Sequence, residues 1–101
     1  MENKKAILIV AAVVNKDKME DLTLYLQKAG PLTDQYGGKG LARYKTLENI
    51  SGDQSPEILS VTEFPSAETI KVLVNSAEYK ALDNLRSTAF TKLNMIISES
   101  M

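Results

Sequence analysis

The 101-residue sequence contains no cysteine, no histidine and no tryptophan. Without cysteine, the chain has no disulfide, no thiol nucleophile and no zinc–thiolate site. Without histidine, it lacks the usual general base near neutral pH and the commonest metal ligand. Any chemistry must therefore come from carboxylates, amines, guanidinium groups or hydroxyls. We expect neither a metal nor a cofactor.

An excess of charge of one sign is also missing. The net charge is −1, whereas surfaces that bind nucleic acid or anionic membranes normally carry clustered Lys and Arg in excess. The apolar run Ala6–Val14 is too short to span a membrane. Glu2 interrupts the basic start, and no small-residue cleavage site precedes the charged "NKDKMED", so a buried strand is favoured over a secretory signal. We expect a cytoplasmic protein with no nucleic-acid or membrane partner.

Length and composition predict one soluble globular domain over residues 1–101. Hydrophobic residues make up 44% of the chain and charged residues 25%, which is ordinary for such domains. A domain of this size buries about two-thirds of the surface of its unfolded chain. The core is therefore expected to be thin.

Four segments have the composition of strands: Lys5–Val14, Gly40–Asn49, Glu57–Phe64 and Thr91–Ser98. A helix is predicted after the first strand, with Asp17 as its N-cap and Glu20 completing a capping box. Its apolar stripe is Met19, Leu22, Leu26 and Ala29. Gly30-Pro31 should kink or restart this helix, and Gly37 supplies a left-handed C-terminal cap.

Two serines predict the starts of further helices after Pro65. Ser66 should cap a helix that turns Ala67, Ile70 and Leu73 inward, and Ser76 a second one with Tyr79, Leu82 and Leu85 on one face. The resulting order is β-α-β-β-α-β, the ferredoxin-like plan of α+β proteins. It places a four-stranded antiparallel sheet under helices on one face, with the first and third strands in the middle.

One face of this sheet is left without a helix. The side chains of the first strand are apolar on both faces of the sheet. The face without a helix would therefore expose an apolar patch that monomers rarely tolerate. A homodimer that packs sheet against sheet would bury it. The rival interpretation is a shallow groove for another ligand or protein.

The segment "EFPSAETIKVLVNSAEYKALDNLR" (63–86), with "YGGKGLARY" before it, resembles the dimeric α/β barrel superfamily. Within that superfamily the sequence is most similar to the uncharacterised domain-of-unknown-function family 1330. The matching residues are Glu63-Phe64-Pro65-Ser66, Asn75-Ser76-Ala77-Glu78-Tyr79, Arg86 and the helix end Tyr36-Gly37-Gly38.

This resemblance implies a ferredoxin-like protomer whose sheet faces that of a partner, as in a dimeric α/β barrel. It implies no single activity, because the wider superfamily includes cofactor-independent monooxygenases, haem-degrading enzymes, small isomerases and binding regulators. Familiar catalytic members use histidine or tryptophan, and this chain has neither. Haem chemistry is therefore disfavoured.

Four residues are candidates for a helix–sheet pocket: Arg43, Glu63, Tyr79 and Arg86. Tyr79 and Arg86 lie two helical turns apart, so one helix face would carry both, and the guanidinium could hold a carboxylate or enolate oxygen. Glu63 ends an apolar strand and would become a base if burial raised its pKa. Arg43 would stand at the pocket mouth.

Each candidate also has a structural interpretation. Tyr79 packs at a helix start, and Arg86 bonds helix-end carbonyls or pairs with an acid such as Glu63. Glu63 is neutralised by an arginine or by the amides that follow Ser66. Arg43 is an edge-strand charge that discourages further strand pairing.

Two functions remain open from the sequence. The first is a small-molecule-binding domain for a small, partly apolar ligand, with an anionic group suited to the arginines. The second is a cofactor-independent isomerase or monooxygenase for an activated carbonyl or phenolic compound. In that case Glu63 is the base and Arg86 stabilises negative charge as it develops.

Overall fold

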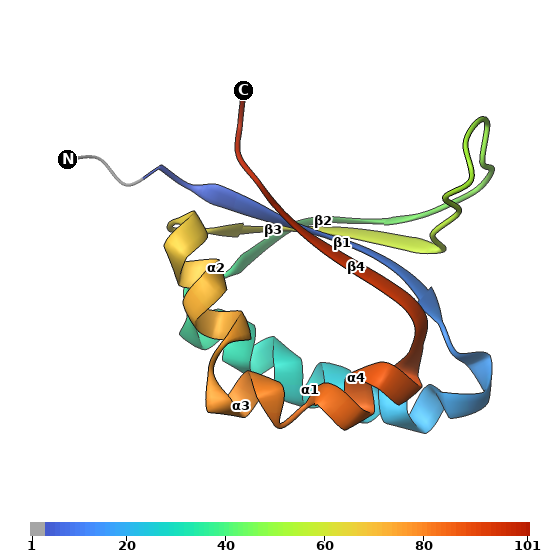
Figure 1. Ribbon diagram of the computed structural model, residues 1–101, viewed down its shortest axis with the longest axis horizontal. Coiled ribbons are helices and arrows are strands. Elements are labelled where there is room, and N and C mark those ends of the chain that lie inside the picture. Colours follow the sequence, from blue (N-terminus) through green and yellow to red (C-terminus); the bar gives the residue numbers. More distant parts are fainter. Residues whose placement is uncertain (1–3) are drawn as a thin grey trace.

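The computed structural model describes residues 4–101 (Figure 1). Along the chain the elements are β1 (Ala6–Val14), a 3₁₀ turn η1 (Lys16–Lys18), α1 (Met19–Gln35), β2 (Lys39–Lys45), β3 (Ile58–Phe64), α2 (Ala67–Val74), α3 (Ala77–Lys80), α4 (Asp83–Ala89) and β4 (Phe90–Ser98). The strands form one antiparallel sheet in the order β2-β3-β1-β4. The ferredoxin-like α+β fold is therefore confirmed, with β1 and β3 in the centre.

The helices all lie on one side of the sheet, and the core lies between the two layers (Figure 1). Alternate residues of β1 face that side. Ala6 and Leu8 are buried there, and Ala6 lies opposite the buried Phe64 of β3. Helices α2 to α4 contribute Ile70, Leu73, Tyr79, Leu82 and Ala89.

The start of α1 differs from the prediction. Asn15, not Asp17, provides the side-chain cap: its Oδ1 accepts a hydrogen bond from the Asp17 amide at 3.1 Å. This contact caps η1, and Lys18 then leads into α1 without a side-chain cap. The capping box of Asp17 and Glu20 is thus wrong, because the intervening 3₁₀ turn moves the cap upstream.

The buried stripe of α1 is also shifted from the predicted one. Tyr25 and Leu32 are buried, with Leu22 and Ala29 partly buried beside them. In contrast, Met19 and Leu26 are 50% and 48% exposed. The buried residues are spaced as regularly along the helix as the predicted ones. The prediction missed this stripe because it did not count Tyr25 as an apolar residue. Pro31 does not divide α1, which runs through to Gln35.

Helices α2 and α3 begin at their predicted caps. Ser66 Oγ accepts a hydrogen bond from the Thr69 amide at 3.2 Å, and Ser76 Oγ accepts one from the Tyr79 amide at 3.1 Å. The helix expected after Ser76 is divided, however, since α3 ends at Lys80 and α4 begins at Asp83. Gly37 has the predicted positive φ, 81°, at the end of α1.

The segment between β2 and β3 is a long loop rather than strand. Strand β2 ends at Lys45, short of the predicted Asn49. Residues 46–57 project from the end of the sheet (Figure 1), and Leu47 and Ile50 are almost fully exposed. The loop is closed at its base by a hydrogen bond from the Thr46 amide to the Glu57 carbonyl, 2.9 Å.

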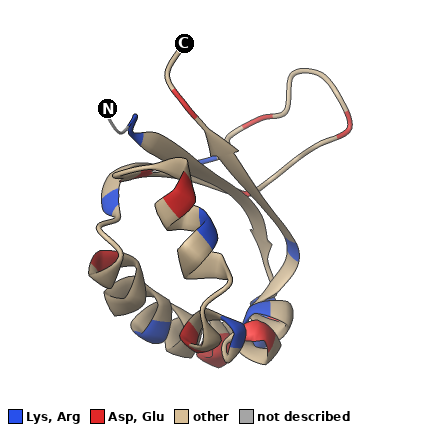
Figure 2. Cartoon of the chain, turned by 60° about the vertical axis from the view of Figure 1, so that its left-hand side comes forward, with Lys and Arg blue, Asp and Glu red and all other residues tan. Residues whose placement is uncertain are grey.

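The sheet face opposite the helices is open and largely apolar. Its residues include Ile7, Ile9, Ala11 and Val13 of β1, Leu59 and Val61 of β3, Ala42 and Tyr44 of β2, and Ile96 of β4. Ile96 is 52% exposed. In Figure 2 the strands are mostly uncharged, and the coloured charges gather on the helices and connections. None of the helices in residues 4–101 is long and apolar enough to cross a membrane.

Candidate functional site

The side chains of Tyr79 and Arg86 are in contact, as their spacing predicted. The guanidinium carbon of Arg86 lies 4.3 Å from the centre of the Tyr79 ring, in cation–π geometry. The break between α3 and α4 does not separate them, because the Arg86 amide still donates to the Leu82 carbonyl at 2.9 Å. The helical path is therefore preserved across the junction.

Tyr79 places a hydroxyl deep in the layer between helices and sheet. Its side chain is 8% exposed, and the hydroxyl donates to the Met95 sulfur on β4 at 3.2 Å. A thioether sulfur is only a weak acceptor. Burial raises the pKa of Tyr79 above its usual value; the neighbouring Tyr25 adds to this, and Arg86 opposes it. The hydroxyl therefore stays protonated at neutral pH and acts as a hydrogen-bond donor.

Tyr25 is the part of this cluster that sequence reasoning missed. From the sequence, Tyr25 falls beside the predicted apolar stripe of α1; packing in the core or at its boundary is favoured there over a hydroxyl that lines a helix–sheet cavity. Its buried ring meets the ring of Phe90 edge-on, with 5.6 Å between centroids. Tyr25 and Tyr79 thus reach from the helices towards β4, and their hydroxyls lie near each other. The 22-25-29-32 spacing was the signal that could have revealed it.

Arg86 has one satisfied and one unsatisfied end. Its side chain is 15% exposed, and Nη2 donates to the Oδ1 of Asp83, three residues earlier. The acid is thus Asp83, not Glu63. The other nitrogen, Nη1, is buried and has no hydrogen-bond partner; among residues 4–101 no other buried side-chain nitrogen or oxygen is left in this state.

Glu63 lies on the open face of the sheet, away from this cluster. It stands opposite Ile7 of β1 and Lys39 of β2, and adjacent residues of a strand point to opposite faces, so the buried Phe64 marks the helix side. The Glu63 carboxylate pairs with Lys5, 3.5 Å from Oε1 to Nζ. It therefore contacts neither an arginine nor the amides after Ser66.

Arg43 is exposed near the end of β2 and lines a separate groove of about 830 Å³. That groove lies between η1, the first turn of α1, the ends of β2 and β3, and the loop 46–57. The four candidates therefore do not meet in one pocket. Only Tyr79 and Arg86 come together.

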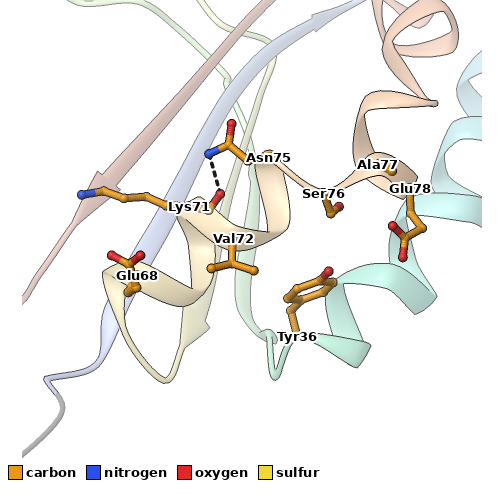
Figure 3. Close-up of a pocket in the computed structure, with 8 residues that line it drawn as sticks. All are labelled: Tyr36, Glu68, Lys71, Val72, Asn75, Ser76, Ala77 and Glu78. Atoms are coloured by element: carbon orange, nitrogen blue, oxygen red, sulfur yellow. Dashed lines mark hydrogen bonds between the residues drawn. The ribbon is translucent and has the colours of Figure 1, made fainter.

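A second hollow, of about 460 Å³, lies at the junction of α2 and α3 (Figure 3). Its polar groups are already engaged: Asn75 Nδ2 donates to the Lys71 carbonyl at 2.8 Å, and Ser76 Oγ donates to the Leu73 carbonyl at 2.7 Å. In Figure 3, Lys71 and Glu68 extend away from Tyr36. This hollow is a shallow helix junction, and none of its described side chains has a buried donor without a partner.

The interior cluster has two donor groups that lack a strong acceptor: Nη1 of Arg86 has no partner among the described residues, and the Tyr79 hydroxyl donates to a sulfur atom. No group of three or more acidic, histidine or cysteine side chains in residues 4–101 could hold a metal ion. What the cluster presents is a cation and a neutral phenol, embedded among apolar side chains. Together with the fold, this defines a ferredoxin-like domain with an internal Tyr–Arg donor pair.

The chain belongs to the family described as Domain of unknown function (DUF1330), which matches residues 6–101. The family resemblance expected from residues 63–86 is thereby confirmed. The sequence has no match among curated proteins.

Solved structures share the fold at low sequence identity. A protein of unknown function from Rhodopseudomonas palustris has a TM-score of 0.82 and 15% identity, covering 99% of this chain and 85% of its own. A putative antibiotic biosynthesis monooxygenase from Nitrosomonas europaea has a TM-score of 0.62 and 12% identity, covering 100% and 94%. A dimeric ferredoxin-like protein of unknown function from Bacteroides fragilis has a TM-score of 0.59 and 13% identity, covering 99% and 100%.

Proposed function

We propose that this protein is a small-molecule-binding domain whose ligand is a small, partly apolar anion held by Tyr79 and Arg86. The observation that carries the proposal is the buried Nη1 of Arg86, which has no partner. A buried donor left unsatisfied costs about 1–3 kcal/mol, and more when it is charged. A ligand oxygen that accepts a hydrogen bond from Nη1 would remove this cost, and ligand binding would be favoured by the same amount.

The second donor strengthens this interpretation. The Tyr79 hydroxyl donates to the sulfur of Met95 and lies beside the hydroxyl of Tyr25. A carboxylate or enolate oxygen would be a better acceptor than the sulfur. Both donors belong to one contact pair. An anionic oxygen on a small ligand therefore suits this cluster better than a neutral group does.

The surroundings suit the apolar part of the ligand. Leu82 is buried beside the pair, and Phe90 and Met95 are partly buried around it. Methionine side chains adapt to irregular shapes, because they are flexible and polarisable. An aromatic or short aliphatic carboxylate fits these neighbours.

The enzymatic alternative is a cofactor-independent isomerase or monooxygenase for an activated carbonyl or phenolic compound. The fold of the Nitrosomonas europaea protein supports it as an analogy only. Within one chain, Glu63 lies on the opposite face of the sheet from the Tyr79–Arg86 pair. Glu63 therefore cannot act as the base on a substrate held by Arg86 of the same chain. The protonated Tyr79 hydroxyl would instead donate a hydrogen bond to a substrate oxygen.

We further propose that the protein is a homodimer that packs through its open sheet face. The apolar residues of that face are uncovered, and patches of this kind mark interaction sites. The dimeric relative from Bacteroides fragilis has the same fold. A cytoplasmic location, expected from the sequence, is part of the same proposal.

The ligand proposal is tested with benzoate as the probe and benzyl alcohol as its uncharged counterpart. We expect benzoate to shift backbone amide resonances of Tyr79, Arg86 and Met95 in an NMR titration, and benzyl alcohol to shift them far less. Arg86→Met should abolish the benzoate shifts. Lys80→Met, which removes an exposed cation from the neighbouring helix, should leave them unchanged. Equal benzoate binding by wild type and Arg86→Met would refute the proposal.

A further inference from the structure

The groove beside Arg43 has features of a second ligand site that is separate from the Tyr79–Arg86 pair. It measures about 830 Å³, within the range of small-molecule sites in proteins. None of its lining residues belongs to the interior cluster of Tyr25, Tyr79, Arg86 and Met95. A ligand bound in this groove would therefore be independent of a ligand bound at Tyr79 and Arg86.

The inner surface of this groove is apolar. Val14, Leu22 and Ile58 line it and are partly buried, and Met19 covers one side while remaining 50% exposed. These residues come from β1, α1 and β3, where the ends of the three elements meet. An apolar ligand segment would remove their remaining surface from water, a gain of about 25 cal/mol for each Å² buried.

The rim on the β2 side carries two cations without partners. Arg43 and Lys45 stand opposite Ser60 and Ile58 of β3, so both extend on the side where Ile58 lines the groove. Within residues 4–101, neither makes an ion pair.

The acids of the groove leave these cations available. Glu57 is engaged twice: its Oε1 accepts a hydrogen bond from the Val14 amide at 3.0 Å, and its Oε2 lies 3.8 Å from Lys16 Nζ. Glu48, in the loop, is the other acid of the lining. The unpaired positive charge therefore lies on the β2 side, next to the apolar surface.

We propose that this groove binds an amphipathic anion, of the class of medium-chain fatty acids. Its carboxylate would lie at Arg43 and Lys45, and its alkyl chain would lie along Met19, Leu22 and Ile58. The charge complementarity of the rim selects the acid head, and the apolar inner surface selects the tail. A purely apolar ligand would leave the cations of the rim unpaired, and a purely polar anion would leave the apolar inner surface uncovered.

The experiment compares octanoate with octanol, which has the same tail without the charge. Binding is followed by NMR titration and by calorimetry on the full chain. We expect octanoate to shift the amide resonances of Met19, Arg43 and Ile58, and to bind about tenfold more tightly than octanol.

Two matched pairs of variants assign the head and the tail. Arg43→Gln with Lys45→Gln should weaken octanoate binding about tenfold, whereas Lys28→Gln with Lys80→Gln, equal in net charge and outside the groove, should not. Met19→Glu should weaken binding by repulsion and lost apolar contact. Leu26→Glu, on the same helix and equally exposed, should leave it unchanged. Met19 begins α1, where a carboxylate favours the helix, so Met19→Glu should fold.

Three results would overturn this inference. Octanoate binding that disappears in Arg86→Met but survives in the Arg43/Lys45 double variant would move the ligand to the interior pair. An absence of octanoate binding, combined with a change in oligomeric state in Met19→Glu, would make the groove a contact between copies of the chain. Equal affinity for octanol and octanoate would remove the role of the cations. In contrast, failure of benzoate to bind at Arg86 would leave the octanoate result intact.

Discussion

The guanidinium of Arg86 lies over the ring of Tyr79, 4.3 Å from its centre, and one of its nitrogens faces no acceptor. This contact combines a stabilising stack with an unsatisfied charge in the same side chain. The two effects oppose each other in the free protein.

Replacing Arg86 by methionine should change stability little. The variant loses a cation–π contact worth about 1–2 kcal/mol at a buried site. It also loses the ion pair with the exposed Asp83, worth about 0–1 kcal/mol, but it removes the cost of a buried donor without a partner. We expect the free energy of unfolding, measured with urea, to stay within about 1 kcal/mol of wild type or to rise. A loss of about 3 kcal/mol or more would show that Arg86 is there for the fold rather than for a ligand.

Tyr79 should make the protein sensitive to alkaline pH. Its folded pKa lies above the usual 10.0, so the unfolded chain releases this proton first as the pH rises. The stability contribution of protonated Tyr79 is full below about pH 10 and falls above it. Urea unfolding of wild type and Tyr79→Phe should therefore differ by a constant amount near neutral pH, and the difference should shift in favour of Tyr79→Phe above about pH 10. A constant difference at every pH would contradict this.

Gly38 should not tolerate a side chain. A Cβ atom at this position would lie 2.5 Å from Thr33 Cγ2 and 2.8 Å from the Cζ of the buried Phe64. We expect Gly38→Ala to lower the free energy of unfolding by about 1–3 kcal/mol, because the core must shift to admit it. Gly40→Ala is the control, since a Cβ there meets nothing within 4 Å. Equal effects of the two substitutions would refute the packing argument.

The proposed homodimer should depend on the open sheet face. Ile96→Asp places a charge on the part of that face formed by the outer strand β4, opposite Ile9 of β1. Val72→Asp instead places a charge on α2, at a residue that is similarly exposed, 50% against 52%. Sedimentation equilibrium should give a dimer for wild type and for Val72→Asp, and a monomer for Ile96→Asp. A dimer that survives Ile96→Asp would place the interface elsewhere.

The sequence was sufficient for the architecture because the relevant signals are local. The serine caps at 66 and 76, the glycine at 37 and the apolar run of β1 each depend on a few neighbouring residues. The contact of Tyr79 with Arg86 was predictable for the same reason, since it follows from helical spacing.

What the sequence could not supply depends on three-dimensional packing. Which face of β3 carries Glu63 is decided by its register with β1, and a pairing shifted by one residue would reverse it. Tyr25 joins the site only because α1 is rotated to bury it. The unsatisfied state of Arg86 Nη1 results from the whole neighbourhood. Each of these features depends on contacts between residues far apart in the sequence, and no local motif indicates them.

Both outer strands of the sheet carry an irregularity in their pairing. The β2–β3 register shifts between Gly40 and Ala42, and the β1–β4 register shifts between Val13 and Val14. Bulges of this kind twist a strand and disturb the row of free amides and carbonyls along its outer edge. Lys39 and Arg43 on one edge and Lys92 on the other add charge there. Growth strand by strand into a ribbon or fibre is therefore disfavoured at both margins, which leaves the open face as the surface through which the proposed homodimer would form.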